Sequence, residues 1–313
     1  MTAPAWHAEP WSILRQRAER NALPHALLLA GPTGLGKREF LERFVRARLC
    51  QQPVDGEACG QCRACALLAA GSHPDRVAVT FAERADGKGL RSEIVVDQIR
   101  ALGPRLAMAS QFGGWQVASI DPADALNAAA ANALLKTLEE PTPATLIVLV
   151  ADAPWRLPAT IRSRCQRVDF RLPSREEALA WLRAQGLADA AAALDAAGGN
   201  PGLALAFARD GALARRDEVA RDLAALAQGR ADAFALARSW ADDAPVDRLW
   251  FAAALAADEA RAQAQGARGP LGLAAADGDA LGAWFAHANR TRELLRGPLR
   301  AELALLELLA AWR

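Results

Sequence analysis

The chain has 313 residues, of which 23% are charged and 52% are hydrophobic, and its mean hydropathy is near zero. This composition is typical of a soluble globular protein and excludes a disordered or collagen-like chain. Residues 1–170, 171–210 and 211–313 carry formal charges of +3, −1 and −1. None of these parts is basic enough to hold a nucleic-acid backbone by itself, because such binding requires many neutralised phosphates. We therefore expect any nucleic-acid contact to be shared with a partner.

The sequence also indicates the compartment. No run of 18 apolar residues lacks a charge, so we expect no transmembrane helix. The first ten residues lack the basic start and apolar core of a secretory signal. Four of the five cysteines cluster between residues 50 and 65, which suits a metal site in a reducing compartment better than a disulfide framework. We expect a cytoplasmic protein.

The first 170 residues alternate between strand-like and helix-like patterns. Short apolar runs bounded by turn residues predict buried strands, and these runs are 26–30, 77–81, 116–120, 146–151 and 168–170. Helical spacing of apolar residues predicts helices over 11–21, 37–49, 94–109 and 125–140. This alternation predicts an α/β domain over 1–170, with a mainly parallel sheet covered on both faces.

The remaining sequence is helical in character. Ser174-Arg-Glu-Glu177 matches a capping box, in which the two outer side chains bond each other's backbone amides. Helices are predicted at 175–185, 188–197 and 202–209, and together they form a small helical domain over 171–210. Alanine- and leucine-rich helices without any strand-like run predict an all-α domain over 211–313.

A candidate phosphate-binding loop lies between the first predicted strand and the helix after it. Its glycines let backbone N–H groups point at phosphate oxygens, and its lysine can reach the outer phosphates. The candidate nucleotide-binding residues are Gly31, Thr33, Gly34, Gly36 and Lys37. In the usual pattern the next residue is a hydroxyl that binds Mg²⁺, whereas here it is Arg38, which has no lone pair to offer. The loop suits phosphate better than metal-assisted chemistry, and binding of ATP or ADP stays open.

A second catalytic position also departs from the pattern. The strand at 116–120 ends in Asp121, where related enzymes place the acid that supports Mg²⁺. The next residue, where a carboxylate would orient the attacking water, is Pro122, and Asp124 lies three positions beyond Asp121. Two positions needed for hydrolysis are therefore chemically unfit.

Four cysteines, separated by eight, two and two residues, have metal-ligand spacing. They are Cys50, Cys59, Cys62 and Cys65. Four thiolates complete a tetrahedral zinc site without an open position, which is the structural kind of site, and zinc would then stabilise the fold. An iron–sulfur cluster is the alternative, although the usual spacing to the fourth ligand is absent, and unliganded thiols are a third possibility. Cys165 lies outside the group and is expected to be a small buried hydrophobe.

Three segments that follow the loop in order carry a family resemblance. They are the cysteine cluster 50–65, the string Leu134-Leu-Lys-Thr-Leu-Glu-Glu-Pro141, and Ile161-Arg-Ser-Arg-Cys165. Over about residues 11–210 the chain resembles the AAA+ subunits of the bacterial sliding-clamp loader. The resemblance implies an AAA+ ATPase-like domain with a zinc module, a helical lid over 171–210, and a C-terminal helical collar domain that packs with its counterparts in a ring.

The departures from the family pattern point to one branch of it. ATPase subunits of the family keep every catalytic position, whereas delta-prime members have lost several. Besides Arg38 and Pro122, Ala151 stands at the polar sensor position and Gly202 stands where an arginine senses nucleotide. The resemblance therefore implies a subunit without ATPase activity, which acts as the stator of the DNA polymerase III clamp loader.

The resemblance also assigns a role to Arg164, in Ser163-Arg-Cys165. An arginine at a rigid subunit edge can enter a neighbouring active site and neutralise charge on the transferring phosphoryl group. Arg164 is the implied finger, Arg162 is the nearby alternative, and a surface ion pair is the purely structural interpretation. Lys136, Glu139 and Glu140 have the spacing to pair on one helix face.

The implied partners are the tau and gamma ATPase subunits and the delta subunit, with transient contact to the sliding clamp and primer–template DNA. Two alternatives remain. One is a working ATPase subunit that uses Asp124 and Lys37 in unusual ways. The other is a zinc-dependent nucleic-acid-binding module with a vestigial ATPase domain, against which the charge of only +3 on residues 1–170 weighs.

Overall fold

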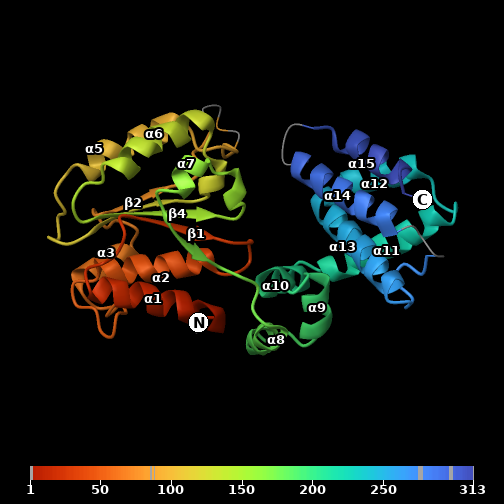
Figure 1. Ribbon diagram of the computed structural model, residues 1–313, viewed down its shortest axis with the longest axis horizontal. Coiled ribbons are helices and arrows are strands. Elements are labelled where there is room, and N and C mark those ends of the chain that lie inside the picture. Colours follow the sequence, from red (N-terminus) through yellow and green to blue (C-terminus); the bar gives the residue numbers. More distant parts are fainter. Residues whose placement is uncertain (1–2, 85–86, 88, 274–277, 296–298, 313) are drawn as a thin grey trace. The chain divides into compact units, whose positions relative to one another are not determined.

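The computed structural model describes residues 3–84, 87, 89–273, 278–295 and 299–312. The chain forms two compact units, Met1–Glu177 and Ala178–Arg313 (Figure 1). The first unit has a hydrophobic cluster on each face of its sheet, and the second unit has one hydrophobic core. None of the described helices is both long and apolar enough to cross a membrane.

The first unit contains a five-stranded sheet. Its strands are β1 (Ala26–Ala30), β2 (Arg76–Val79), β3 (Gln116–Ile120), β4 (Thr145–Ala151) and β5 (Gln166–Asp169). They lie in the order β2-β3-β4-β1-β5, and each neighbouring pair is parallel. The predicted α/β fold with a parallel sheet is thus confirmed. β1, β3 and β4 are completely buried, whereas β5 is a mostly exposed edge strand, which explains why its apolar run is so short.

Helices cover both faces of this sheet, as Figure 1 shows. One face carries η1 (Ala5–His7), α1 (Ala8–Glu19), α2 (Lys37–Leu49) and α3 (Arg63–Ala69); the other carries α4 (Val96–Arg100), α5 (Leu102–Leu106), α6 (Ala128–Glu139) and α7 (Ala159–Arg162). Successive strand side chains point to opposite faces, so Leu27 and Leu29 join the α1–α2 core while Leu28 joins the α6–α7 core. Two short helical turns, η2 (Ala123–Ala125) and η3 (Pro154–Arg156), follow β3 and β4.

The predicted helix over 94–109 is two short helices, α4 and α5. Pro104 lies inside this stretch and has no backbone N–H, so it cannot bond the carbonyl of Arg100 four residues earlier. The chain therefore starts a new helix at Leu102.

The described residues of the second unit form helices joined by turns and loops, without a strand. Its helices are α8 (Arg175–Ala184, which begins in the first unit), α9 (Ala190–Ala196), α10 (Pro201–Arg209), α11 (Ala212–Ala227), α12 (Ala233–Asp242), α13 (Pro245–Ala264), α14 (Gly278–Leu294) and α15 (Ala301–Ala310). The predicted capping box is present: Ser174 N–H donates to Glu177 Oε2 at 2.9 Å, and Glu177 N–H donates to Ser174 Oγ at 3.2 Å. One continuous core runs from Ala178 to Trp312, and the division into a lid and a collar at residue 210 stays a prediction.

Parallel strands bring the candidate site together. The loop 31–37 follows β1, Asp121 follows β3, and Asp152 follows β4. All three therefore lie at the carboxyl edge of the sheet, where open α/β sheets place their ligands.

Candidate functional site

Two glycines allow the close packing of the loop 31–37, and side chains of the N-terminal segment contact its backbone. A Cβ on Gly31 would lie 2.2 Å from the carbonyl oxygen of Phe170, and a Cβ on Gly36, at φ +77°, would lie 2.8 Å from the His7 ring. Trp6 Nε1 donates to Leu35 O at 3.0 Å, and His7 Nε2 lies 2.8 Å from the same oxygen. Burial lowers the pKa of His7, which favours the neutral ring. Sequence reasoning did not assign this loop contact to Trp6 and His7, because nothing in their spacing points to Leu35.

Lys37 turns back onto its own loop. Its Nζ donates to Gly31 O at 2.7 Å and to Pro32 O at 2.6 Å, and it lies 2.6 Å from Asp152 Oδ1. Two of the three N–H donors of the ammonium group are therefore used within the loop, and the group forms an ion pair with the Asp152 carboxylate. The side chain is only 1% exposed. Burial lowers the pKa of Lys37, and the Asp152 carboxylate opposes that effect.

Arg38 joins the two carboxylates at the strand ends. It makes a bidentate pair with Asp121, with Nε–Oδ2 at 2.9 Å and Nη2–Oδ1 at 2.8 Å, and its Nη2 also donates to Asp152 Oδ2 at 3.1 Å. Burial raises the pKa of Asp121 despite this pairing. Burial also acts to raise the pKa of Asp152, but Lys37 and Arg38 outweigh it, so that pKa is lowered.

Lys37, Arg38, Asp121 and Asp152 thus form a charge quartet in which two cations neutralise two anions. Asp121, which the sequence predicted to support Mg²⁺, is instead bound to Arg38. Arg38 occupies the position of the usual metal-binding hydroxyl. Asp124 does not join the quartet: its two oxygens accept the backbone N–H groups of Asp152 and Ala153 at 3.3 and 3.1 Å. Asp152 was not singled out from sequence as a partner of Lys37, because 115 residues separate them.

The other predicted nucleotide-sensing positions carry no polar side chain. Ala151 is the buried last residue of β4 and pairs in register with Ala30. Gly202 is the second residue of α10, in the other unit. Thr33 and Gly34 complete the loop between Pro32 and Leu35.

The four predicted metal ligands converge. Cys50 caps the end of α2, Cys62 caps the start of α3, Cys65 lies within α3, and Cys59 lies between the two helices. All four sulfurs lie within 4.8 Å of one another, with Cys50 Sγ 3.5 Å from that of Cys59 and 3.9 Å from that of Cys62. Bonds of about 2.3 Å to a tetrahedral zinc would place the sulfurs about 3.8 Å apart. The spacing therefore fits a metal ion of that size.

Hydrogen bonds from backbone amides stabilise the thiolate form of these cysteines. The N–H groups of Cys59, Cys62 and Cys65 donate to the preceding sulfur of the cluster at 3.3, 3.4 and 3.5 Å. Burial opposes ionisation of Cys62, yet hydrogen bonds from the Cys65 and Gln51 amides and from the neighbouring thiols lower its pKa to about 6. Burial raises the pKa of Cys65 to about 12. A bound metal replaces the remaining thiol protons, and four soft sulfur donors suit zinc or an iron–sulfur cluster. Cys165 lies apart and is buried in the sheet core, as expected.

Arg164 lies between α7 and β5 and is 36% exposed. Its Nη2 pairs with Glu139 Oε1 at 2.7 Å, and its Nη1 donates to the carbonyl of Thr160 at 3.0 Å. Arg162 is exposed. Glu139 therefore pairs with Arg164, and Lys136 makes no ion pair with either of its neighbouring glutamates within the described part of the chain.

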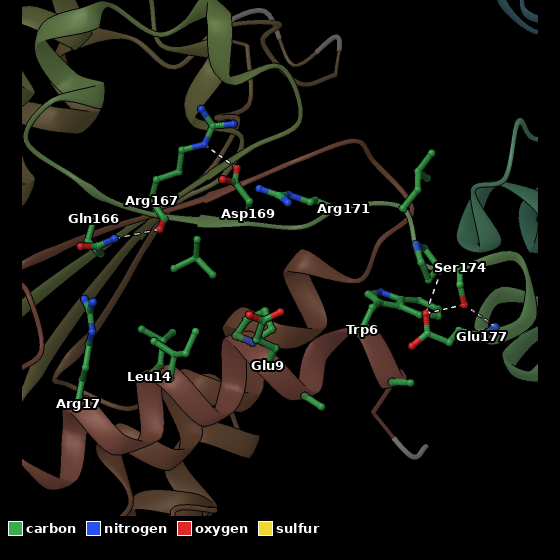
Figure 2. Close-up of a pocket in the computed structure, with 17 residues that line it drawn as sticks. Trp6, Glu9, Leu14, Arg17, Gln166, Arg167, Asp169, Arg171, Ser174 and Glu177 are labelled. Atoms are coloured by element: carbon green, nitrogen blue, oxygen red, sulfur yellow. Dashed lines mark hydrogen bonds and ion pairs between the residues drawn. The ribbon is translucent and has the colours of Figure 1, made fainter.

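A groove of about 620 Å³ lies elsewhere on the first unit, between η1–α1 and the chain from β5 to Glu177 (Figure 2). Its lining carries charges of both signs, from Arg17, Arg167, Arg171, Glu9, Asp169 and Glu177. No residue of the loop 31–37 lines it. The balanced charge gives this groove no preference for a phosphate group.

The charge quartet generates a stability prediction for Asp152→Asn. This change leaves the buried Lys37 ammonium without its anion, so we expect the free energy of unfolding at pH 7 to fall by about 1.5–3 kcal/mol. The folded-state pKa of Asp152 is lowered, so its contribution is present above the unfolded pKa of about 3.9 and disappears as the pH falls through the folded pKa. Urea unfolding as a function of pH measures both effects.

Two further variants serve as controls for that measurement. Asp169→Asn removes an exposed ion pair with Arg167 and should cost less than about 1 kcal/mol. Adding Lys37→Met to Asp152→Asn should recover stability, because no buried charge is then left unpaired. Equal stability of Asp152→Asn and the parent chain at pH 7 would contradict the assigned ion pair.

Comparison with known proteins identifies the family. Residues 6–174, more than half of the chain, match the family model described as DNA polymerase III, delta subunit. DNA polymerase III subunit delta' of Pseudomonas aeruginosa is 40% identical over 253 residues, which span 79% of this chain and 74% of that protein. The subunit delta' of Escherichia coli is 40% identical over 58% of this chain and 54% of its own length. Subunit tau of Bacillus subtilis is 38% identical over 47% of this chain and 24% of its own length. Together with the parallel-sheet domain and its four-cysteine cluster, these matches show that the chain belongs to the delta-prime subunit family of the DNA polymerase III clamp loader.

Proposed function

We propose that this chain is a clamp-loader subunit that does not hydrolyse ATP and that supplies Arg164 in trans to a neighbouring ATPase subunit. In that role it acts as the stator of the complex while the sliding clamp is loaded onto primed DNA. The observation that carries the proposal is the charge quartet, in which the loop lysine and the candidate metal carboxylates are paired with charges of the same chain.

Loss of hydrolysis follows from the needs of the reaction. Phosphoryl transfer requires a metal ion, a cation on the outer phosphates and a group that orients water. Here Arg38 bridges Asp121 and Asp152, and the two oxygens of Asp124 are bonded to backbone amides. A phosphate group on Lys37 would have to compete with the Asp152 carboxylate for the ammonium group.

The finger role of Arg164 is supported by its surroundings. A guanidinium has five N–H donors, and the two bonds to Glu139 and Thr160 use two of them. Arg164 therefore keeps donors for an approaching phosphate while its side chain stays partly exposed. The buried Cys165 and Ile161 on either side fix the backbone from which it projects.

The partners follow from the same proposal. An ATPase subunit of the tau or gamma type would receive Arg164, and a delta subunit would complete the ring together with transient contacts to the clamp and primer–template DNA. Residues 1–170, 171–210 and 211–313 would act as the ATPase-like domain, lid and collar. The helices of the last part would pack against their counterparts in the ring.

We further propose that the four clustered cysteines hold one structural zinc ion. The hydrogen bonds from backbone N–H groups to the sulfurs and the distances between the sulfurs support a zinc site over free thiols. All four positions of a tetrahedral ion would be filled by protein, which leaves no place for a substrate. The ion would tie the segment 51–61 to the ends of α2 and α3.

A working ATPase subunit is the second candidate, and the retained Lys37 is the observation that favours it. In that case a bound nucleotide would draw Lys37 away from Gly31 and Pro32. Turnover by the chain itself would then depend on this lysine.

The finger proposal predicts the effect of Arg164→Ala on the assembled clamp loader. Removing an arginine finger slows hydrolysis at the active site that it enters by about 10³-fold or more. The ATPase rate of the complex should therefore lose nearly all of the contribution of the one active site that faces this chain. Assembly, followed by gel filtration, should be unchanged. Arg162→Ala is the matched control and should leave the rate unaltered. An unchanged rate with Arg164→Ala would rule out the finger.

The zinc proposal predicts one metal ion per chain by elemental analysis. Cys62→Ser should remove it, and the same variant should lower the melting temperature because metal binding is linked to folding. Cys165→Ala, which lies outside the cluster, should retain a full equivalent of zinc. Iron with a visible charge-transfer spectrum, or no metal in the parent chain, would contradict the assignment.

A further inference from the structure

Glu139 and Glu140 stand where helix electrostatics disfavour them. Glu139 is the last residue of α6 and Glu140 caps that helix, so both carboxylates add to the negative end of the helix dipole. Stability of the helix alone would favour a basic residue there. The ion pair with Arg164 brings a cation to this helix end, and it gives the Glu139 carboxylate a partner outside its own helix.

The two elements that anchor Arg164 are fixed to one core. Leu134 and Leu138 of α6 and Ile161 of α7 are buried in the same hydrophobic cluster. The carboxylate of Glu139 and the carbonyl of Thr160 therefore approach the guanidinium from two rigid helices. Each contacts a different Nη atom, which leaves Nε–H and one N–H on each Nη for another group.

We propose that Glu139 is a positioning residue for Arg164. It orders the guanidinium at the surface before a neighbouring subunit arrives, while three N–H donors stay available for the phosphate of that subunit. An arginine side chain has high rotamer entropy, and ordering it in advance lowers the entropic cost of binding. This inference rests on the finger role proposed above.

The test measures the ATPase rate of the assembled clamp loader with variants of this full-length chain. The informative quantity is the Arg164-dependent rate, which is the parent rate minus that with Arg164→Ala. Glu139→Ala should lower the kcat of the Arg164-dependent ATPase activity about two- to five-fold, as expected for loss of an exposed ion pair. The KM for ATP should change little. Glu139→Gln should give a smaller loss, because its amide oxygen still accepts a hydrogen bond. Glu140→Ala is the matched control and should have no effect.

A second background separates positioning from a structural effect. When Arg164→Ala is already present, Glu139→Ala should cause no further loss of rate. An equal loss in both backgrounds would overturn the inference, because Glu139 would then act through the fold. An unchanged or faster rate with Glu139→Ala alone would also overturn it. If Arg164→Ala itself leaves the rate unchanged, the finger proposal fails and this inference fails with it.

Discussion

Mutual neutralisation of four charges at the carboxyl edge of the sheet is the constraint on which the functional interpretation depends. Parallel strands deliver Asp121 and Asp152 to that edge, and the loop after β1 delivers Lys37 and Arg38. In a nucleotide-hydrolysing site these positions would face phosphate and metal. Here they pair with one another, and this pairing is the basis of the proposal that the chain does not hydrolyse ATP.

The retained phosphate loop is explained by the same packing. The loop is held from one side by Trp6 and His7 at Leu35 O and from the other by the close approach of Gly31 to Phe170. Gly31 and Gly36 are needed for these contacts whether or not phosphate is bound. Under the proposal that this chain does not hydrolyse ATP, the loop would still be required for the packing of the first unit, from which Arg164 projects.

Much of this structure could be predicted from the sequence, and the exceptions have physical reasons. β1 and α2 match their predicted bounds because an apolar run ends at glycine and helical spacing begins at Lys37. The cysteine cluster follows from its spacing alone. The division between α4 and α5 at Ala101 was missed because the apolar periodicity continues across it. α3 was missed because it has only seven residues and lies inside the cysteine cluster. The Lys37–Asp152 and Arg164–Glu139 pairs could not be predicted, since they depend on side-chain conformation and on tertiary contacts between distant segments.

The proposed stator role requires that the chain turns over no nucleotide by itself. The most direct measurement is ATP turnover by the purified chain, assayed for zinc content, with Mg²⁺ and without partner subunits. Phosphate release should equal that of a blank without protein. Steady turnover that Lys37→Ala abolishes would rule out the stator role, because Lys37 would then bind a phosphate group and not complete the charge quartet.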